Sequence, residues 1–176
     1  PFQTLRCAEQ IKVNLGYMKQ KICMVGLASG LVLGNLGFTH CSIEEIGVLR
    51  CIPNISIVVP SDPFELFKIL QEAINYKNSL YIRLTAGANT RIINSKDYKF
   101  KIGKAIEIMS GDNVAIISNG NIIGNCIDAA VLLKKNKISC SVINMHTIKP
   151  IDKKKIVEIS KKFKLIITIE EHNIIG

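Results

Sequence analysis

Short apolar runs alternate with helix-start signals along this chain, and that order limits the folds that it can adopt. Residues 55–59 are almost continuously apolar, as expected for a strand that is buried on both faces of a parallel sheet. Asp62 is a suitable helix N-cap and Glu65 suits the third helical position, so a helix is predicted over residues 63–75. The next apolar run covers residues 80–84. Strands separated by helices indicate βαβ units and a parallel sheet.

The alternation continues toward both ends of the chain and is interrupted once. Residues 88–103 are rich in turn formers and lose the periodic pattern, which indicates a linker. The other elements are predicted as helices over residues 4–15, 121–135 and 153–163, and as strands over residues 21–26, 114–118, 139–145 and 165–169. The predicted fold class is therefore α/β, with two doubly wound, mostly parallel-sheet domains over residues 1–87 and 104–176.

The charge distribution argues against a nucleic-acid or membrane partner. The 176 residues have a net charge of +9, which arises mainly from lysines. These lysines fall on predicted helix faces or ends and are not interleaved with aromatic residues, whereas a nucleic-acid interface needs a clustered basic face or a stacking platform. No apolar run reaches the roughly 18 residues that are needed to cross a bilayer. We therefore expect the lysines to form a solvated surface.

The cysteines and the start of the chain both point to an intracellular, cytoplasmic protein. Six cysteines are scattered without a C-x-x-C pair, so we expect small buried side chains in a reducing compartment and no metal site. The N-terminus has neither an initiator Met nor the pattern of a signal peptide. We expect the chain to begin inside a longer protein, with its first domain truncated at the N-terminus.

A glycine-bearing loop that ends in His40 is the best candidate for chemistry. Ser42 and Glu45 have the spacing of a capping box, which predicts a helix start directly after the loop. The positive end of that helix would disfavour the imidazolium form, so a neutral imidazole could donate or accept a proton there. A histidine that only caps or packs at the loop end explains the same residues, because no second catalytic group is fixed beside it.

Several segments, taken in order, resemble the signatures of the transketolase family. The pyrimidine-binding domain of that family has a pattern that runs roughly T-H-x-x-I-E-D, R-x-x-P-N and then P-x-D. The matching segments are Thr39-His40, Ile43-Glu44-Glu45, Leu49-Arg50, Ile52-Pro53-Asn54 and Pro60-Ser61-Asp62-Pro63. Residues 81–84 resemble the last strand of that domain, and residues 144–150 and 170–176 resemble two stretches of the family's C-terminal domain. The resemblance spans nearly the whole chain.

The resemblance implies that residues 1–87 are part of a pyrimidine-binding domain and that residues 104–176 are a C-terminal domain truncated at its end. It implies binding of the pyrimidine ring of thiamine diphosphate, for which Phe2 is the available aromatic residue, although a core aromatic explains Phe2 equally well. It also implies that His40 approaches the sugar substrate as a catalytic residue.

The same resemblance implies a partner. The family's diphosphate-binding G-D-G segment is missing from this sequence, and the glutamate that protonates the pyrimidine ring is expected upstream of Pro1. A diphosphate-binding domain or N-terminal subunit would therefore hold the diphosphate and its Mg²⁺, in a homodimer or heterotetramer. We expect a transferase that moves a two-carbon ketol unit between sugars, and we expect this chain alone to be inactive.

Three positions depart from the pattern of well-studied transketolases. Ala28 replaces a histidine, Leu36 replaces an aspartate that contacts a sugar hydroxyl, and Ala86 replaces an arginine that holds the substrate phosphate. The loss of two cationic contacts argues against an ordinary pentose-phosphate substrate. The alternatives are a non-catalytic assembly or remnant domain of the same fold, a 2-oxoacid dehydrogenase β subunit and a deoxyxylulose-phosphate synthase. The retained His40 favours an enzyme.

Overall fold

The computed structural model of the protein describes residues 1–85, 90–95 and 97–176. The helices are α1 (Ala8–Ile11), the π-helix η1 (Lys12–Tyr17), the 3-10 helix η2 (Gly34–Leu36), α2 (Glu45–Arg50), α3 (Pro63–Ala73), α4 (Ile123–Lys135) and α5 (Lys153–Lys162). The strands are β1 (Cys23–Gly26), β2 (Ile55–Val58), β3 (Ser79–Arg83), β4 (Ile106–Met109), β5 (Val114–Ser118), β6 (Cys140–Asn144), β7 (Thr147–Lys149) and β8 (Leu165–Ile169).

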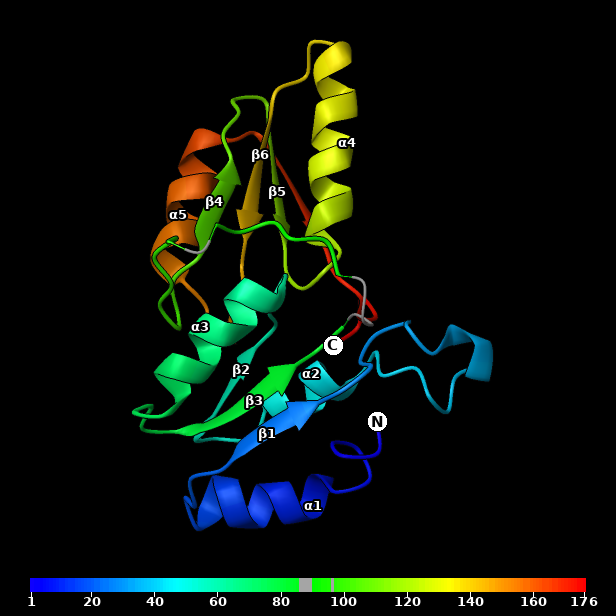
Figure 1. Cartoon of the computed structure of the whole chain (residues 1–176), viewed down its shortest axis with the longest axis vertical. Helices are drawn as coiled ribbons and strands as arrows, with labels where there is room; N and C mark the ends of the chain where they lie inside the picture. Colours follow the sequence, from blue (N-terminus) through cyan, green and yellow to red (C-terminus); the bar gives the residue numbers. More distant parts are fainter. Residues whose placement is uncertain (86–89, 96) are drawn as a thin grey trace.

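The strands form two four-stranded, mostly parallel sheets with the orders β1-β3-β2-β7 and β4-β6-β5-β8. Each sheet is packed with helices, and Figure 1 shows the second sheet between α4 and α5. The predicted α/β fold class is therefore confirmed. The strands predicted at residues 114–118 and 165–169 have the predicted bounds, because both are apolar runs that end at clear turn signals.

Apolar side chains fill both faces of the first sheet, because alternate residues of β2 and β3 point to opposite sides. One core cluster joins the sheet to α1, η1 and α2 and contains Ile11, Leu15, Met24, Ile46, Leu49, Ile52, Ile55, Ile57 and Tyr81. The other joins it to α3 and contains Val58, Ile69, Leu80, Ile82 and Ile102. The carboxyl ends of β1 and β3 are left free for the loops that build the site.

The two predicted N-caps near the first sheet have opposite outcomes. The Asp62 side chain accepts a hydrogen bond from the Glu65 N–H at 2.8 Å, so the predicted start of α3 is confirmed, while the helix ends at Ala73. The predicted capping box at Ser42 is wrong. α2 begins at Glu45, its N-cap residue Glu44 makes no side-chain cap bond, and the Glu45 carboxylate is paired with Arg83 instead. Ion pairing with a buried guanidinium has replaced capping at this helix.

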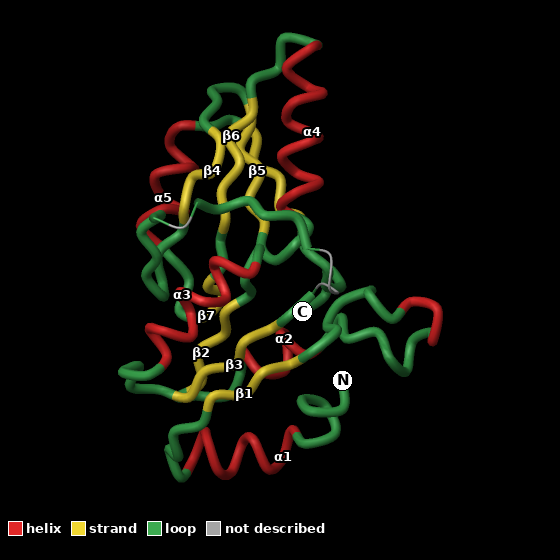
Figure 2. Tube along the Cα trace, viewed as in Figure 1, coloured by secondary structure: helices red, strands yellow, loops and turns green. Residues whose placement is uncertain are grey.

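β4 and β7 were not predicted from the sequence. β7 follows the buried His146 and adds an antiparallel strand to the first sheet, with Ile57 opposite Lys149 and Val58 opposite Thr147. The second half of the chain therefore completes the sheet of the first half, as the tube in Figure 2 also shows. A strand of three residues is too short to give a periodic signal in the sequence.

A buried hydrogen-bond network also joins the two halves. The Glu65 carboxylate accepts hydrogen bonds from the Ser61 hydroxyl at 2.8 Å, the Tyr98 hydroxyl at 2.9 Å and Asn144 Nδ2 at 2.9 Å. Glu65 itself is completely buried. A buried carboxylate needs such donors. Glu65, in the first turn of α3, therefore also forms a fixed contact with Asn144 of β6.

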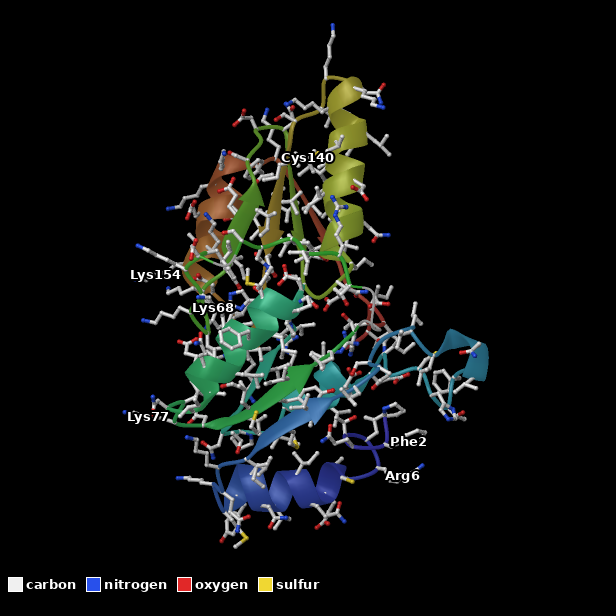
Figure 3. The ribbon with its side chains drawn as sticks, viewed as in Figure 1. Phe2, Arg6, Lys68, Lys77, Cys140 and Lys154 are labelled. Atoms are coloured by element: carbon white, nitrogen blue, oxygen red, sulfur yellow. The ribbon has the colours of Figure 1, made fainter. Side chains whose placement is uncertain are left out.

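The surface agrees in part with the expectations from composition. Lys68, Lys77 and Lys154 lie at the periphery of the molecule in Figure 3. Three cysteines are buried, but Cys23 and Cys51 are exposed, so the expectation of buried cysteines holds for only some of them. Within the described part of the chain, no helix combines the length and the hydropathy that a membrane crossing requires.

Candidate active site

A loop of residues 27–44 leaves the carboxyl end of β1 and projects from the body of the protein (Figure 1). Its base is closed by an antiparallel bridge in which Gly30 N–H donates to Ser42 O at 2.8 Å and Ser42 N–H donates to Gly30 O at 3.1 Å. In open parallel sheets, ligands bind at the carboxyl ends of the strands. The loop therefore starts at the edge of the sheet where a ligand site is expected.

Arg83, the last residue of β3, fixes the base of this loop. Its guanidinium is fully buried and pairs with the equally buried Glu45 carboxylate. It also donates to Ser42 O at 3.0 Å and to Glu171 O at 2.8 Å. The Arg83 side chain thus holds the loop, α2 and the C-terminal segment together. These contacts give Arg83 a structural role. Burial raises the pKa of the nearby Glu171 carboxyl.

Phe2 and His40, the two residues that the sequence analysis selected, lie against each other. Their ring centroids are 5.1 Å apart in an edge-to-face arrangement. His40 is half-buried, and its Nδ1 lies 3.0 Å from the Thr39 hydroxyl. The Arg6 guanidinium carbon lies 4.6 Å from the centroid of the Phe2 ring, and Figure 3 shows Phe2 and Arg6 in the same N-terminal segment.

The predicted position of His40 at the start of a helix is wrong. α2 begins at Glu45, five residues beyond the histidine, and has only six residues. A dipole effect is confined to the first turn of a helix, and His40 lies outside the first turn of α2. His40 takes its position from the loop and from the contact with Phe2 instead.

A cavity of about 290 Å³ opens where these two rings meet, and we refer to it as the Phe2–His40 cavity. The residues that line it are Pro1, Phe2, Gln3, Thr4, Val25, Gly26, Leu27, Ala28, Ser29, Leu33, His40 and Tyr81. Apolar groups dominate the wall, with a few hydroxyl groups and one imidazole, as is usual for a small-molecule site. The N-terminal segment, the carboxyl end of β1, the loop that follows β1 and Tyr81 of β3 thus form the cavity jointly.

Sequence reasoning missed two polar residues of this cavity, Tyr81 and Ser29. The Tyr81 hydroxyl oxygen lies 3.4 Å from the Ser29 hydroxyl oxygen, and both residues are buried. Burial raises the pKa of Tyr81 to about 12, so its hydroxyl is protonated at neutral pH. The available signal was Gly26, since a glycine within a strand often marks the close approach of another group.

The three positions that depart from the family pattern differ in where they lie relative to the cavity. Ala28 lines the cavity with a left-handed backbone, φ 55°. Leu36 lies in η2 and is 51% exposed, away from the residues that line the cavity. Ala86 lies outside the described residues. Over the residues that the structure describes, no group of three His, Cys, Asp or Glu side chains could hold a metal ion.

Known protein families match both halves of the chain. The family described as "Transketolase, pyrimidine binding domain" matches residues 1–90, and "Transketolase, C-terminal domain" matches residues 103–176. One subunit of an apulose-4-phosphate transketolase from Actinobacillus succinogenes is 38% identical over 176 residues, which are 100% of this chain and 56% of that protein. This chain therefore spans little more than half of that relative.

Two further proteins are similar to this chain. A "1-deoxy-D-xylulose-5-phosphate synthase" from Caldanaerobacter subterraneus subsp. tengcongensis is 34% identical over 145 residues, which are 82% of this chain and 23% of that protein. A solved structure described as "Split gene transketolase, inactive beta4 tetramer" has a TM-score of 0.86 and 29% identity, and the match covers 99% of this chain and 56% of that one.

Proposed function

This chain belongs to the transketolase family, and we propose that it is part of an enzyme that transfers a two-carbon ketol unit between sugars with thiamine diphosphate as its cofactor. The observation that carries the proposal is the contact between Phe2 and His40 at the wall of one cavity. An aromatic ring that can pack on a flat heterocycle lies there beside an imidazole that can exchange protons.

The lining of the Phe2–His40 cavity fits the pyrimidine half of the cofactor. Phe2, Val25 and Leu27 offer an aromatic ring and two apolar side chains, and Phe2 is 44% exposed. The pyrimidine ring is flat and uncharged, and apolar burial and stacking stabilise such a ring. We propose that these residues hold the pyrimidine ring. Thiamine diphosphate, when bound, supplies the carbanion chemistry of ketol transfer.

His40 is the residue that we propose to act on the sugar. Its Nδ1 faces the Thr39 hydroxyl at 3.0 Å, which leaves Nε2 as the ring nitrogen that can exchange a proton with a substrate hydroxyl or carbonyl oxygen. The loop that presents it is fixed at its base by Arg83, so this base does not have to be ordered when the substrate binds. Catalysis by positioned proton transfer contributes typically about 10²–10⁴-fold.

The diphosphate and its Mg²⁺ require a partner. We propose that a diphosphate-binding domain or N-terminal subunit holds them, in a homodimer or a heterotetramer. Two similar proteins support a divided enzyme: the relative from Actinobacillus succinogenes is one subunit of a transketolase, and the similar solved structure is a split-gene transketolase. The cytoplasmic location and the absence of nucleic-acid and membrane partners stay predictions.

A non-catalytic assembly domain of the same fold is the second candidate. Ala28 favours it, because this methyl group lines the cavity where well-studied transketolases have a histidine. A domain that had lost its reaction would keep the sheets and the buried Arg83–Glu45 pair but would have no use for His40.

Calorimetry and an activity assay separate the two candidates. Thiamine diphosphate with Mg²⁺ would be titrated into the full-length gene product combined with its N-terminal partner, and ketol transfer would then be assayed. We expect binding and transfer by the wild type, and a loss in kcat/KM of about 100-fold or more in His40→Ala with cofactor binding retained. Lys154→Ala, at the far periphery, is the control. A wild-type complex that binds no cofactor would leave only the assembly function.

A further inference from the structure

We propose that the hydroxyl groups of Tyr81 and Ser29 form a neutral hydrogen-bonding subsite of the Phe2–His40 cavity and recognise a hydroxyl group of the sugar substrate there. The inference rests on the proposed function and deepens it, because it assigns one wall of the cavity to one part of the substrate. The placement of the Tyr81 ring, the free hydrogen-bonding capacity of both hydroxyls and the uncharged lining support it.

The Tyr81 ring extends from the core to the cavity wall. It belongs to the core cluster under α1 and α2, and in the register of the sheet Tyr81 is the partner of Met24, two residues before Gly26. A Cβ on Gly26 would lie 2.5 Å from the Tyr81 hydroxyl oxygen. The missing side chain at Gly26 therefore provides the space through which the phenol reaches the carboxyl edge of the sheet.

Both hydroxyl groups have capacity for a further partner. Their separation of 3.4 Å exceeds the roughly 2.5–3.0 Å of a normal bond between hydroxyl groups. Each hydroxyl has one donor and two acceptor positions, so this long contact leaves most of them unused. Tyr81 is 1% exposed and Ser29 is 3% exposed, so a group that reaches them must enter the cavity and leave its water behind. Unused capacity in such a place favours a polar ligand group.

The position of Ser29 is fixed independently of Tyr81. Its N–H donates to Leu84 O at 2.9 Å, just beyond the end of β3, and the left-handed Ala28 precedes it. The backbone that carries the Ser29 hydroxyl is therefore fixed before a ligand binds, which lowers the cost of ordering a recognition group.

The charge of the lining selects the class of ligand group. Among the described residues that line the cavity, none is Lys, Arg, Asp or Glu, and burial keeps the Tyr81 phenol neutral by raising its pKa. A phosphate group would lose its water here without gaining a Lys or Arg partner. A sugar hydroxyl can exchange its water for the Tyr81 and Ser29 hydroxyls. The phosphate or other anionic end of a substrate is thus directed away from this wall.

The test uses the full-length protein in complex with its N-terminal partner subunit. Tyr81→Phe removes one oxygen and keeps the ring, so the thermal stability should change little. For a ketose donor, kcat/KM should fall about two- to tenfold, while the affinity for thiamine diphosphate stays within about twofold of the wild type. Donors that each lack a single hydroxyl are then compared. For the donor that lacks the recognised hydroxyl, kcat/KM should be the same in Tyr81→Phe as in the wild type. That donor identifies the hydroxyl that Tyr81 binds.

Tyr76→Phe is the matched control, because the Tyr76 hydroxyl bonds the Ser56 hydroxyl at 2.9 Å and does not line the cavity. It should leave the donor kinetics unchanged. An unaltered kcat/KM for every donor in Tyr81→Phe, in an active complex, would overturn the inference. So would a selective loss of cofactor affinity, which would assign the hydroxyl to thiamine diphosphate. A wild-type complex without cofactor binding or transfer would overturn the proposed function itself, and the inference with it.

Discussion

Gly26 and Tyr81 are sterically complementary residues on neighbouring parallel strands. A Cβ on Gly26 would lie 2.5 Å from the Tyr81 hydroxyl oxygen and 2.8 Å from Cε2 of the same ring. Neither distance is compatible with van der Waals contact, and the aromatic ring is packed within the core. The residue without a side chain on β1 is therefore matched to a large aromatic residue on β3.

Gly26→Ala is expected to destabilise the protein by about 1–3 kcal/mol, because the added methyl group overpacks the site. Urea unfolding of the purified protein measures this. Adding Tyr81→Leu should remove the clash, so that the double variant loses less stability than the sum of the two single variants. Gly34→Ala is the control, since nothing lies within 4 Å of its Cβ position. Additive losses would contradict the steric match.

Removal of one partner from the buried Arg83–Glu45 pair is expected to be costly. Glu45→Leu leaves an uncompensated buried guanidinium, and we expect a loss of about 3–5 kcal/mol in the free energy of unfolding. The exposed pair Arg91–Asp128 offers a matched control, for which Asp128→Ala should cost less than about 1 kcal/mol. Equal losses at the two pairs would show that burial is not the cause.

The stability of the protein should fall in mild acid because of His146. Burial lowers the pKa of this imidazole in the folded protein, although the carboxylates of Glu65, Glu72 and Asp152 act in the opposite direction. Below a pH of about 6.5 the unfolded chain therefore binds a proton that the folded chain does not, and the free energy of unfolding decreases as the pH falls.

Unfolding free energies measured between about pH 7 and pH 5 test this dependence. In the wild type, His146 Nδ1 lies 2.8 Å from the Thr147 hydroxyl oxygen, and His146→Asn retains a polar group near that hydroxyl. The variant should be less stable at neutral pH but should lose less stability than the wild type on acidification. The expected difference in slope is at most about 1.4 kcal/mol per pH unit. Parallel curves would show that His146 does not titrate differently in the two states.

Phe2→Leu tests the cofactor part of the proposed function. We expect the affinity of the complex with the partner subunit for thiamine diphosphate to fall about three- to tenfold, because aromatic contacts add about 0.5–1.5 kcal/mol beyond burial. Calorimetric titration in the presence of Mg²⁺ gives this affinity. Tyr17→Leu, at a side chain that is 85% exposed, is the control and should have no effect. An unchanged affinity in Phe2→Leu would assign Phe2 to packing alone.

Local signals in the sequence predicted the fold wherever one short segment contains the whole cause. Asp62 caps α3 because the N–H group that it accepts from is only three residues away. Ser42 has the same local spacing, yet Glu45 is paired with Arg83, which lies 38 residues further along the chain. A local pattern cannot report a distant guanidinium, and the predicted cap failed for that reason.

The candidate site likewise combines residues that were selected from the sequence with contacts that only the fold creates. The loop motif predicted a role for His40, and the family resemblance implied one for Phe2, but only the folded chain brings the two rings to 5.1 Å. Tyr81 was missed because its sequence neighbours describe an ordinary buried strand. Its position at the cavity wall depends on Gly26, which comes from another strand, and no single-segment pattern contains both residues.

The pairing of β7 with β2 determines how the chain can be divided and made. β2 is completely buried, and without β7 it would be an open edge of the first sheet. During synthesis, β2 can pair with β7 only after Lys149 has left the ribosome. We expect a fragment that stops near residue 103 to keep that edge exposed and to aggregate more readily than the whole chain.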